Sequence, residues 1–284
     1  MRAVCACVLV LALPAGAWAQ GINTDVALPV AAGQGIWRSQ LRFERASGDP
    51  SPADRDVRMW TAPQTLLVGI TPRLTALATL PVLAQRRTRS DSNTLGSDPA
   101  AGDLTLLGRY TLWQDDYAPL ATRRAAILAG VKFPTGPDRF GTATFDPILG
   151  GVATWAADRH EIDVDGLYSV STRRNGFRQG GRLRFDLAYR YRLWPRRFGA
   201  RLLQLNGLLE VNGQWSDRNQ KDGRRIADSG GRVLFLAPGV QLAAKDWILE
   251  ASLQVPIEQD LRGSRVEQDL VAVLGVRVPF WLPF

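Results

Sequence analysis

The feature that most constrains this chain is a two-residue alternation of apolar and polar side chains over ten or more consecutive residues. It is clearest near the C-terminal end, where every second residue from 270 to 280 is apolar. The segments 182–193, 203–214 and 247–256 repeat the pattern. Because successive side chains of a β-strand point to opposite faces, each segment is predicted to be a strand with one apolar face.

The length and number of these segments indicate a membrane-spanning sheet. Ordinary globular strands run about 5–6 residues, whereas a tilted strand of about 9–11 residues crosses a bilayer. Weaker alternation adds strands at 36–45, 57–69, 74–85, 103–113, 123–134, 146–156, 160–171 and 232–242. Proline cannot donate to a ladder, so bulges or strand ends are expected at Pro63, Pro81, Pro238 and Pro256.

A sheet in hydrocarbon must close on itself, because no water is present to pair an exposed edge. The predicted fold is therefore all-β, a transmembrane up-and-down antiparallel β-barrel of about 12 strands over residues 36–284. Long polar links near 46–56, 87–101, 135–145, 172–181, 215–231 and 258–268 alternate with short ones near 70–73, 114–122, 157–159, 194–200 and 243–246. In bacterial barrels the short links are periplasmic, and an even number of strands leaves both ends of the chain on that side. Both termini are therefore expected in the periplasm.

The N-terminal residues have the features of a secretory signal peptide. Met1 and Arg2 precede an apolar run, and Ala17-Trp18-Ala19 predicts cleavage after Ala19. Domain boundaries are thus expected at 1–19 for the signal and 20–35 for a periplasmic lead-in that either dangles or folds into the lumen. Both cysteines, Cys5 and Cys7, lie in the signal, so the mature chain is expected to have no disulfide or thiolate site.

The expected location is the bacterial outer membrane. Phe284 ends the chain on an aromatic residue after an alternating strand, which resembles the terminal signal that the barrel-assembly machinery recognises. The net charge of +8 fits contact with outer-membrane lipid and lipopolysaccharide, whereas nucleic acid is a poor partner for an exported chain.

Side chains that could carry chemistry are sparse. His160 is the one histidine, and it falls at a short periplasmic turn rather than in a cleft. The stretch Gly130–Gly136 lacks the Gly-Lys-Ser/Thr ending of a phosphate loop. We therefore expect no enzyme activity, no catalytic residue, no metal site and no cofactor.

The predicted inward faces carry nearly balanced charge. The residues expected to line a solute path are Arg109, Arg182, Arg184, Arg190, Arg192, Asp163 and Glu210. Centring the turns near 176–177 and 197 sets Asp163 opposite Arg190, and Arg184 opposite Glu210. Two interpretations stay open: the charges pair across the lumen and close a narrow barrel, or strand 182–192 forms a basic wall that selects anions.

A resemblance adds to this interpretation. Gly130-Val131-Lys132-Phe133-Pro134-Thr135-Gly136, followed by Gly141-Thr142, Asp146 and Leu149-Gly150, resembles a segment of the outer-membrane barrels named for the phenol meta-cleavage pathway. The segments 235–241 and 253–257 resemble later parts of that family, and the similarity spans about 35–284. Residues 142–144 read Thr-Ala-Thr where a more glycine-rich turn is expected.

The resemblance implies a transporter-like barrel for small organic compounds and brings no catalytic residues. The expected function is passive passage of a small solute, aromatic or anionic, through or into the barrel. The alternative is a closed barrel with a structural or surface-interaction role.

Overall fold

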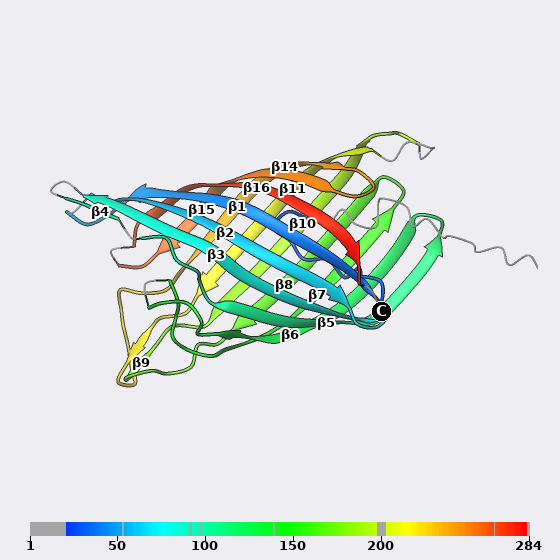
Figure 1. Ribbon diagram of the computed structural model, residues 1–284. Helices are drawn as coiled ribbons and strands as arrows, with labels where there is room; N and C mark the ends of the chain where they lie inside the picture. Colours follow the sequence, from blue (N-terminus) through cyan, green and yellow to red (C-terminus); the bar gives the residue numbers. More distant parts are fainter. Residues whose placement is uncertain are drawn as a thin grey trace, which may run out of the picture.

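The computed structural model of the chain is a closed antiparallel β-barrel (Figure 1). It describes residues 21–52, 54–90, 93–96, 98–138, 140–197, 203–263 and 265–282. Within these residues the barrel strands are β1 (Gln34–Gly48), β2 (Asp56–Gly69), β3 (Leu74–Ser90), β5 (Leu104–Ala118), β6 (Ala121–Phe133), β7 (Asp146–Ala157), β8 (His160–Ser169), β10 (Arg182–Trp194), β11 (Gln204–Ser216), β14 (Gly231–Ala243), β15 (Ile248–Leu261) and β16 (Glu267–Trp281). Each pairs with its neighbour, and β16 pairs with β1 to close the ring, which confirms the predicted twelve-stranded barrel.

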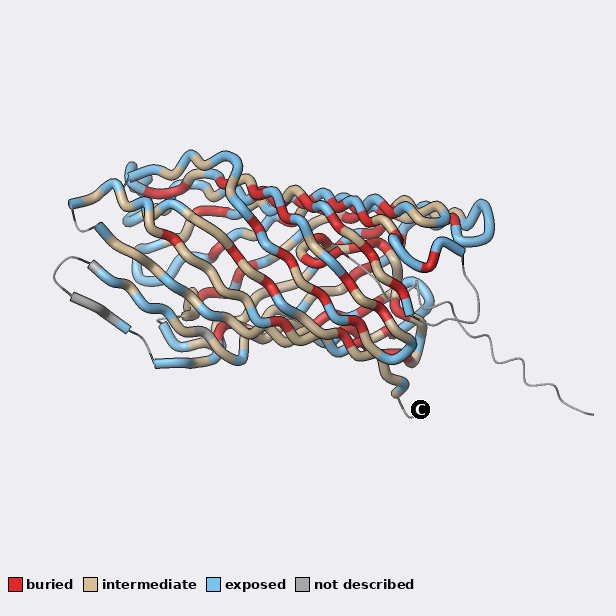
Figure 2. The backbone as a smooth tube through the Cα atoms, turned by 90° about the horizontal axis from the view of Figure 1, so that it is seen from above, coloured by how far each residue is buried: buried red, intermediate tan, exposed pale blue. Residues whose placement is uncertain are grey.

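The two-residue alternation sorts side chains between the lumen and the outer surface. Along β16, Leu274 is 61% exposed on the outside, whereas Arg277 is 1% exposed on the inside. Buried and exposed positions alternate along the strands in the same way (Figure 2). The barrel is therefore apolar outside and polar inside, the arrangement that suits a lipid-facing wall.

The prolines behave in two ways. Pro63 pairs with Pro81 beside a register irregularity between β2 and β3, and Pro256 pairs with Phe235 beside another between β14 and β15. These confirm the expected bulges. The expectation was wrong at Pro238, which continues a regular ladder with Leu209 of β11. The ladder between β14 and β15 is interrupted at Ala237 and Pro238 without a change of register, which fits a residue that has no N–H to donate.

Aromatic side chains gather on the outer surface where the links are short. Arg159 lies over the ring of Tyr191 at 4.4 Å, and Arg123 lies over Tyr117 at 4.5 Å. His160 shares a 2.8 Å hydrogen bond with the hydroxyl of Tyr189. The imidazole thus belongs to the outer aromatic girdle that is typical of membrane interfaces.

At the opposite end the links are longer and partly structured. β4 (Asn93–Gly96) pairs antiparallel with the end of β3. β9 (Phe177–Arg178), β12 (Gln220–Lys221) and β13 (Arg224–Arg225) form a small sheet of three strands at the far rim (Figure 1). Link 134–145 folds around Asp103, whose carboxylate accepts the amides of Gly136 at 3.0 Å and Thr142 at 2.8 Å. Ala143 takes the left-handed conformation, with φ of 53°.

The described residues include no helix long and apolar enough to cross a membrane. The predicted signal peptide and the terminal Phe284 lie outside the described residues, so these two expectations remain predictions.

Candidate functional site: the lumen and its N-terminal plug

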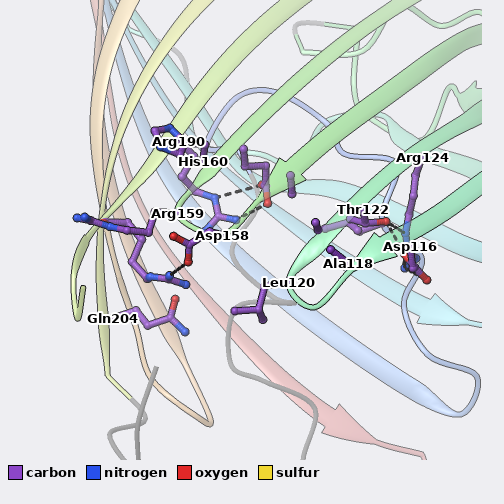
Figure 3. A pocket seen from close by; sticks show the side chains of 15 residues that line it. Asp116, Ala118, Leu120, Thr122, Arg124, Asp158, Arg159, His160, Arg190 and Gln204 are labelled. Carbon is purple, nitrogen blue, oxygen red and sulfur yellow. Dashed lines mark hydrogen bonds and ion pairs between the residues drawn. The ribbon is translucent and has the colours of Figure 1, made fainter. Parts of the chain in front are cut away.

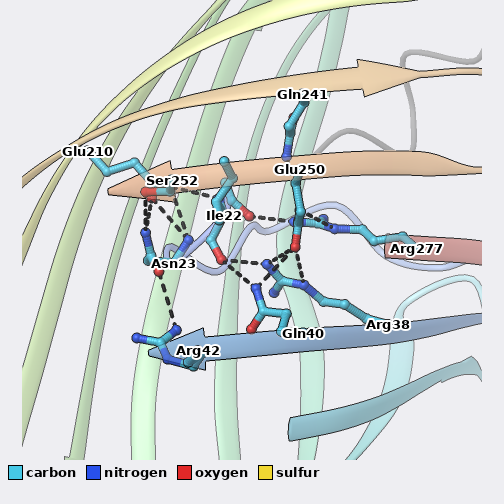
Figure 4. Close-up of polar contacts among 11 residues, drawn as sticks. Ile22, Asn23, Arg38, Gln40, Arg42, Glu210, Gln241, Glu250, Ser252 and Arg277 are labelled. Atoms are coloured by element: carbon cyan, nitrogen blue, oxygen red, sulfur yellow. Dashed lines mark hydrogen bonds and ion pairs between the residues drawn. The ribbon is translucent and has the colours of Figure 1, made fainter. Parts of the chain in front are cut away.

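The segment Gly21–Gly33, which we call the plug, folds into the lumen of the barrel. It contains no strand, and the inward side chains of several strands bind its backbone (Figure 4). The sequence left open whether this lead-in dangles or folds inward, and the structure places it inside.

Two buried glutamates hold the first residues of the plug. Glu210 of β11 accepts the amide of Ile22 at 2.8 Å and the side-chain nitrogen of Asn23 at 2.6 Å. Glu250 of β15 binds Arg38 and Arg277, each at 2.7 Å. Arg277 then donates to the carbonyl of Gly21 at 2.7 Å, and Arg38 donates to the carbonyl of Ile22 (Figure 4).

The middle of the plug is held from the opposite wall. The Asp25 amide donates to Asp165 at 2.6 Å, and the Ala27 amide donates to the Thr154 hydroxyl at 2.9 Å. Arg109 spans the segment, because its two terminal nitrogens donate to the carbonyls of Val26 at 2.8 Å and Leu28 at 2.7 Å. A chain without secondary structure needs such partners, since buried unpaired backbone groups are costly.

Apolar side chains of the plug fill the space between these contacts. Ile22 packs in a cluster with Leu208, Phe235 and Val273, and Val30 packs with Ile36, Leu67 and Leu77. The plug also passes so close to Gly69 that a Cβ there would overlap the carbonyl oxygens of Val30 and Ala31. Burying a side chain such as Ile22 contributes roughly 1.5–3 kcal/mol, so packing and hydrogen bonding hold the plug together.

Cavities lie on both sides of the plug. Toward the short links, a cavity of about 290 Å³ is bounded by Leu28 of the plug and by Asp116, Arg124, Asp158, Arg190 and Gln204 of the wall (Figure 3). Toward the long links, a cavity of about 480 Å³ is bounded by Ile22, Asn23 and Asp25 of the plug. The lumen is thus divided where the plug crosses it.

The larger cavity combines charge with apolar surface. Its wall includes Arg38, Arg42, Arg182 and Arg184 together with Leu77, Leu107, Ile148 and Leu167. Among the described residues, neither Arg42 nor Arg182 has a carboxylate oxygen within ion-pair distance, whereas Arg184 binds Asp25 at 2.8 Å and Asp186 at 3.0 Å. Arg42 donates a hydrogen bond to the Asn23 side-chain oxygen at 3.4 Å.

The residues singled out from the sequence lie at different levels of the lumen. Arg109 and Glu210 hold the plug, and Arg182 and Arg184 face the larger cavity. Asp163, fully buried, accepts the Thr154 hydroxyl at 2.6 Å. Arg190 and Arg192 face the smaller cavity, where Arg190 binds Glu161 and Arg192 binds Asp158 at 2.8 Å. That a solute touches them stays a prediction.

The predicted cross-strand partners were wrong. Arg190 lies opposite Glu161, two residues before the expected Asp163, and Arg184 lies opposite Gln214, four residues after the expected Glu210. Both errors are even-numbered, so the faces stay correct, because a side chain changes face only on an odd shift. The links fold in ways that a centred turn does not describe: residues 174 and 177 form their own bridge within the β8–β10 link.

Sequence reasoning did not select the cluster of Glu250, Arg38 and Arg277. The signal that could have indicated it is an acidic residue on the inward face of β15, together with inward arginines on β16 and β1. These last two strands pair to close the barrel, which brings the three side chains together.

Comparison with known proteins bears on the fold. No protein-family model matches the chain, and no curated protein matches it. Among solved structures, the COG4313 outer membrane channel from Pseudomonas putida F1 is similar at a TM-score of 0.72 and 14% identity, covering 92% of this chain and 100% of that one. The translocator domain of the autotransporter NalP from Neisseria meningitidis is similar at a TM-score of 0.50 and 13% identity, covering 88% and 90%. At these identities the likeness establishes the barrel fold alone.

Proposed function

We propose that this protein is an outer-membrane channel for passive passage of small anionic organic solutes, with the plug closing the lumen in the state described here. The apolar outer wall, the polar lumen and the likeness to an outer membrane channel support the location and the general role. The short links and both termini then face the periplasm, and the long links face outward.

The observation that carries the proposal is the cavity of about 480 Å³ in front of the plug. Arg42 and Arg182 offer guanidinium groups without a carboxylate partner among the described residues, beside Leu77 and Leu107. Arginine binds carboxylates in a bidentate manner, and the leucines suit an apolar or aromatic body. A small organic anion fits both parts of this surface.

The resemblance to the phenol meta-pathway barrels supports aromatic compounds as the solute class. Two residues of the segment that shows the resemblance, Lys132 and Asp146, form a 2.5 Å ion pair next to link 134–145. These two residues therefore stabilise the barrel beside that link.

A closed barrel is the second candidate, favoured by the pairing of Arg184, Arg190 and Arg192 with carboxylates. The arginine-rich strand β10 is thus largely neutralised, which argues against a continuous basic wall. Under this alternative the plug is a permanent part of the core.

A reversible lock on the plug separates the two functions. The Ala27 amide lies 2.9 Å from the Thr154 hydroxyl, and all cysteines of the chain lie at positions 5 and 7. The double variant Ala27→Cys/Thr154→Cys therefore places two cysteines side by side, one on the plug and one on the wall, to be joined by oxidation. We expect single channels in planar bilayers to close on oxidation and reopen on reduction, while each single-cysteine variant ignores both treatments.

Two outcomes would count against the proposal. Equal conductance in the oxidised and reduced forms would show that solutes pass without any movement of the plug. An absence of conductance in every form would favour the closed barrel. For the solute class, Arg42→Glu/Arg182→Glu should reduce the preference for anions over cations, whereas Arg196→Glu/Arg197→Glu, changed outside the cavity, should leave it nearly unchanged.

A further inference from the structure

The rim of the barrel at the long links carries a basic cavity away from the lumen. It measures about 300 Å³ and lies between the small sheet of β9, β12 and β13 and the ends of β11 and β15. Four arginines line it: Arg178, Arg218, Arg225 and Arg262. They come from three links, with Arg218 and Arg225 both between β11 and β14, so the fold gathers them at one place.

These guanidinium groups lack the partners that other rim arginines have. Arg232 binds Glu258 at 2.8 Å, and Arg174 binds Asp138 at 3.2 Å. Within the part of the chain that the structure describes, none of the four cavity arginines has a carboxylate oxygen within 4.0 Å. The one acidic residue in the lining, Asp217, accepts the Tyr168 hydroxyl at 3.3 Å.

An apolar groove of about 480 Å³ adjoins the basic cavity on the outer wall. Leu183, Phe185, Trp215 and Leu234 form its apolar part, and Trp215 and Arg262 line both spaces. Glu258 and Asp260 also line the groove, where Glu258 is paired with Arg232. Gly213, which faces Phe185 across the β10–β11 ladder, leaves room for the ring, because a Cβ at this position would overlap it. The wall thus changes from apolar to cationic over the length of one strand end.

We propose that this combined surface binds a phosphorylated lipid of the outer leaflet, with its phosphate groups among the four arginines and an acyl chain along the groove. Arginine forks bind phosphate oxygens bidentately. Trp215 marks the level at which tryptophan rings sit in a membrane interface, which places the arginines at headgroup height. The inference depends on the outward orientation of the long links proposed above, but not on conduction.

Charge complementarity selects this occupant over a protein or a free anion. A protein partner offers no reason for a basic cavity to continue into a lipid-facing groove, and a free phosphate would leave the groove unused. Basic side chains near an anionic lipid surface attract it additively, so four arginines at one place favour a phosphorylated headgroup.

The test compares lipid binding to the purified full-length protein in neutral detergent. Diphosphoryl lipid A is titrated and bound lipid is counted by native mass spectrometry. The variant R178Q/R218Q/R225Q/R262Q should bind at least about tenfold more weakly than the unaltered protein. The control R58Q/R86Q/R87Q/R89Q removes as many arginines from the opposite side of the same rim, at β2 and β3, and should bind normally.

Further arms identify the source of the phosphate. Trp215→Gln should weaken binding of diphosphoryl lipid A but not that of inorganic phosphate, and monophosphoryl lipid A should bind less tightly. Equal binding by the unaltered protein and the cavity variant would overturn the proposal. So would displacement of the lipid by millimolar inorganic phosphate together with no effect of Trp215→Gln, since the site would then take a free anion. A cavity variant that still conducts but binds no lipid separates this inference from the channel function.

Discussion

The carboxylate of Glu250 lies 2.7 Å from a guanidinium nitrogen of Arg277, and their side chains are 0% and 2% exposed. The pair joins β15 to β16 and turns Arg277 toward the carbonyl of Gly21. One buried ion pair thus links the closure of the barrel to the start of the plug.

Removing Glu250 should destabilise the barrel strongly. Glu250→Ala leaves Arg38 and Arg277 without their shared carboxylate, and breaking a buried pair costs about 3–5 kcal/mol. Glu258→Ala is the matched control, because the Arg232–Glu258 pair has a similar nitrogen–oxygen distance of 2.8 Å but lies exposed, where such pairs contribute about 0–1 kcal/mol. Urea unfolding in lipid vesicles measures the free energy of unfolding of both variants. Equal losses of that free energy would contradict the assignment of Glu250 to a buried network.

Removing Arg109 should loosen the plug without opening the barrel wall. Its guanidinium holds the carbonyls of Val26 and Leu28, and hydrogen bonds to charged groups contribute about 1.5–3 kcal/mol each. In an Arg109→Ala background, a Thr24→Cys probe, 3% exposed in the intact protein, should react with a water-soluble thiol reagent at least about tenfold faster. Arg124→Ala, which removes the rim pair with Asp116, should not change that rate.

Replacing Ala143 with glycine should stabilise the barrel. Ala143 has a φ of 53° in link 134–145, and the left-handed conformation costs a residue with a Cβ roughly 1–2 kcal/mol. Part of that gain is offset by the greater freedom of glycine in the unfolded chain, so we expect a net increase of about 1 kcal/mol in the free energy of unfolding. Ala227→Gly, which changes an alanine without a positive φ in another link, should not raise the free energy of unfolding. A lower free energy of unfolding for Ala143→Gly would contradict the strain at this position.

The link between β1 and β2 should loosen in acid. The Arg55 side chain donates to Asp49 at 2.6 Å and holds the pKa of that carboxyl below its usual range. A lowered pKa stabilises the folded link at pH above the usual carboxyl range, and this contribution is lost as pH falls through the folded pKa. Amide protection factors of Ser51 and Arg55, whose amides donate to Asp49, should fall in strong acid. In Asp49→Asn they should be low already near neutral pH and change little.

The alternation of residues such as Arg184, Asp186 and Leu187 was sufficient to predict the strands and their faces. Each inward charge on β10 was assigned correctly even though its cross-strand partner was not, because the face of a residue depends on local parity. The register depended on how links 172–181 and 194–200 fold, and composition does not specify turn geometry.

The plug was beyond prediction for a related reason. Residues 21–33 lack any periodic pattern, so the sequence predicts no helix or strand for them and gives no indication of where they lie. Their partners Glu210, Thr154 and Arg109 lie 81 to 188 residues away in the chain. The same sequence signature was compatible with a free lead-in and with a filled lumen.

By itself the sequence determined a closed, outward-apolar barrel, because a two-residue period over bilayer-length strands leaves no other way to pair every backbone group. The tertiary structure alone decided which charges meet, where the lumen is divided and where the rim arginines gather. Those properties arise when distant strands close a ring and bring Arg38, Glu250 and Arg277 around one buried segment, and no local pattern encodes such a meeting.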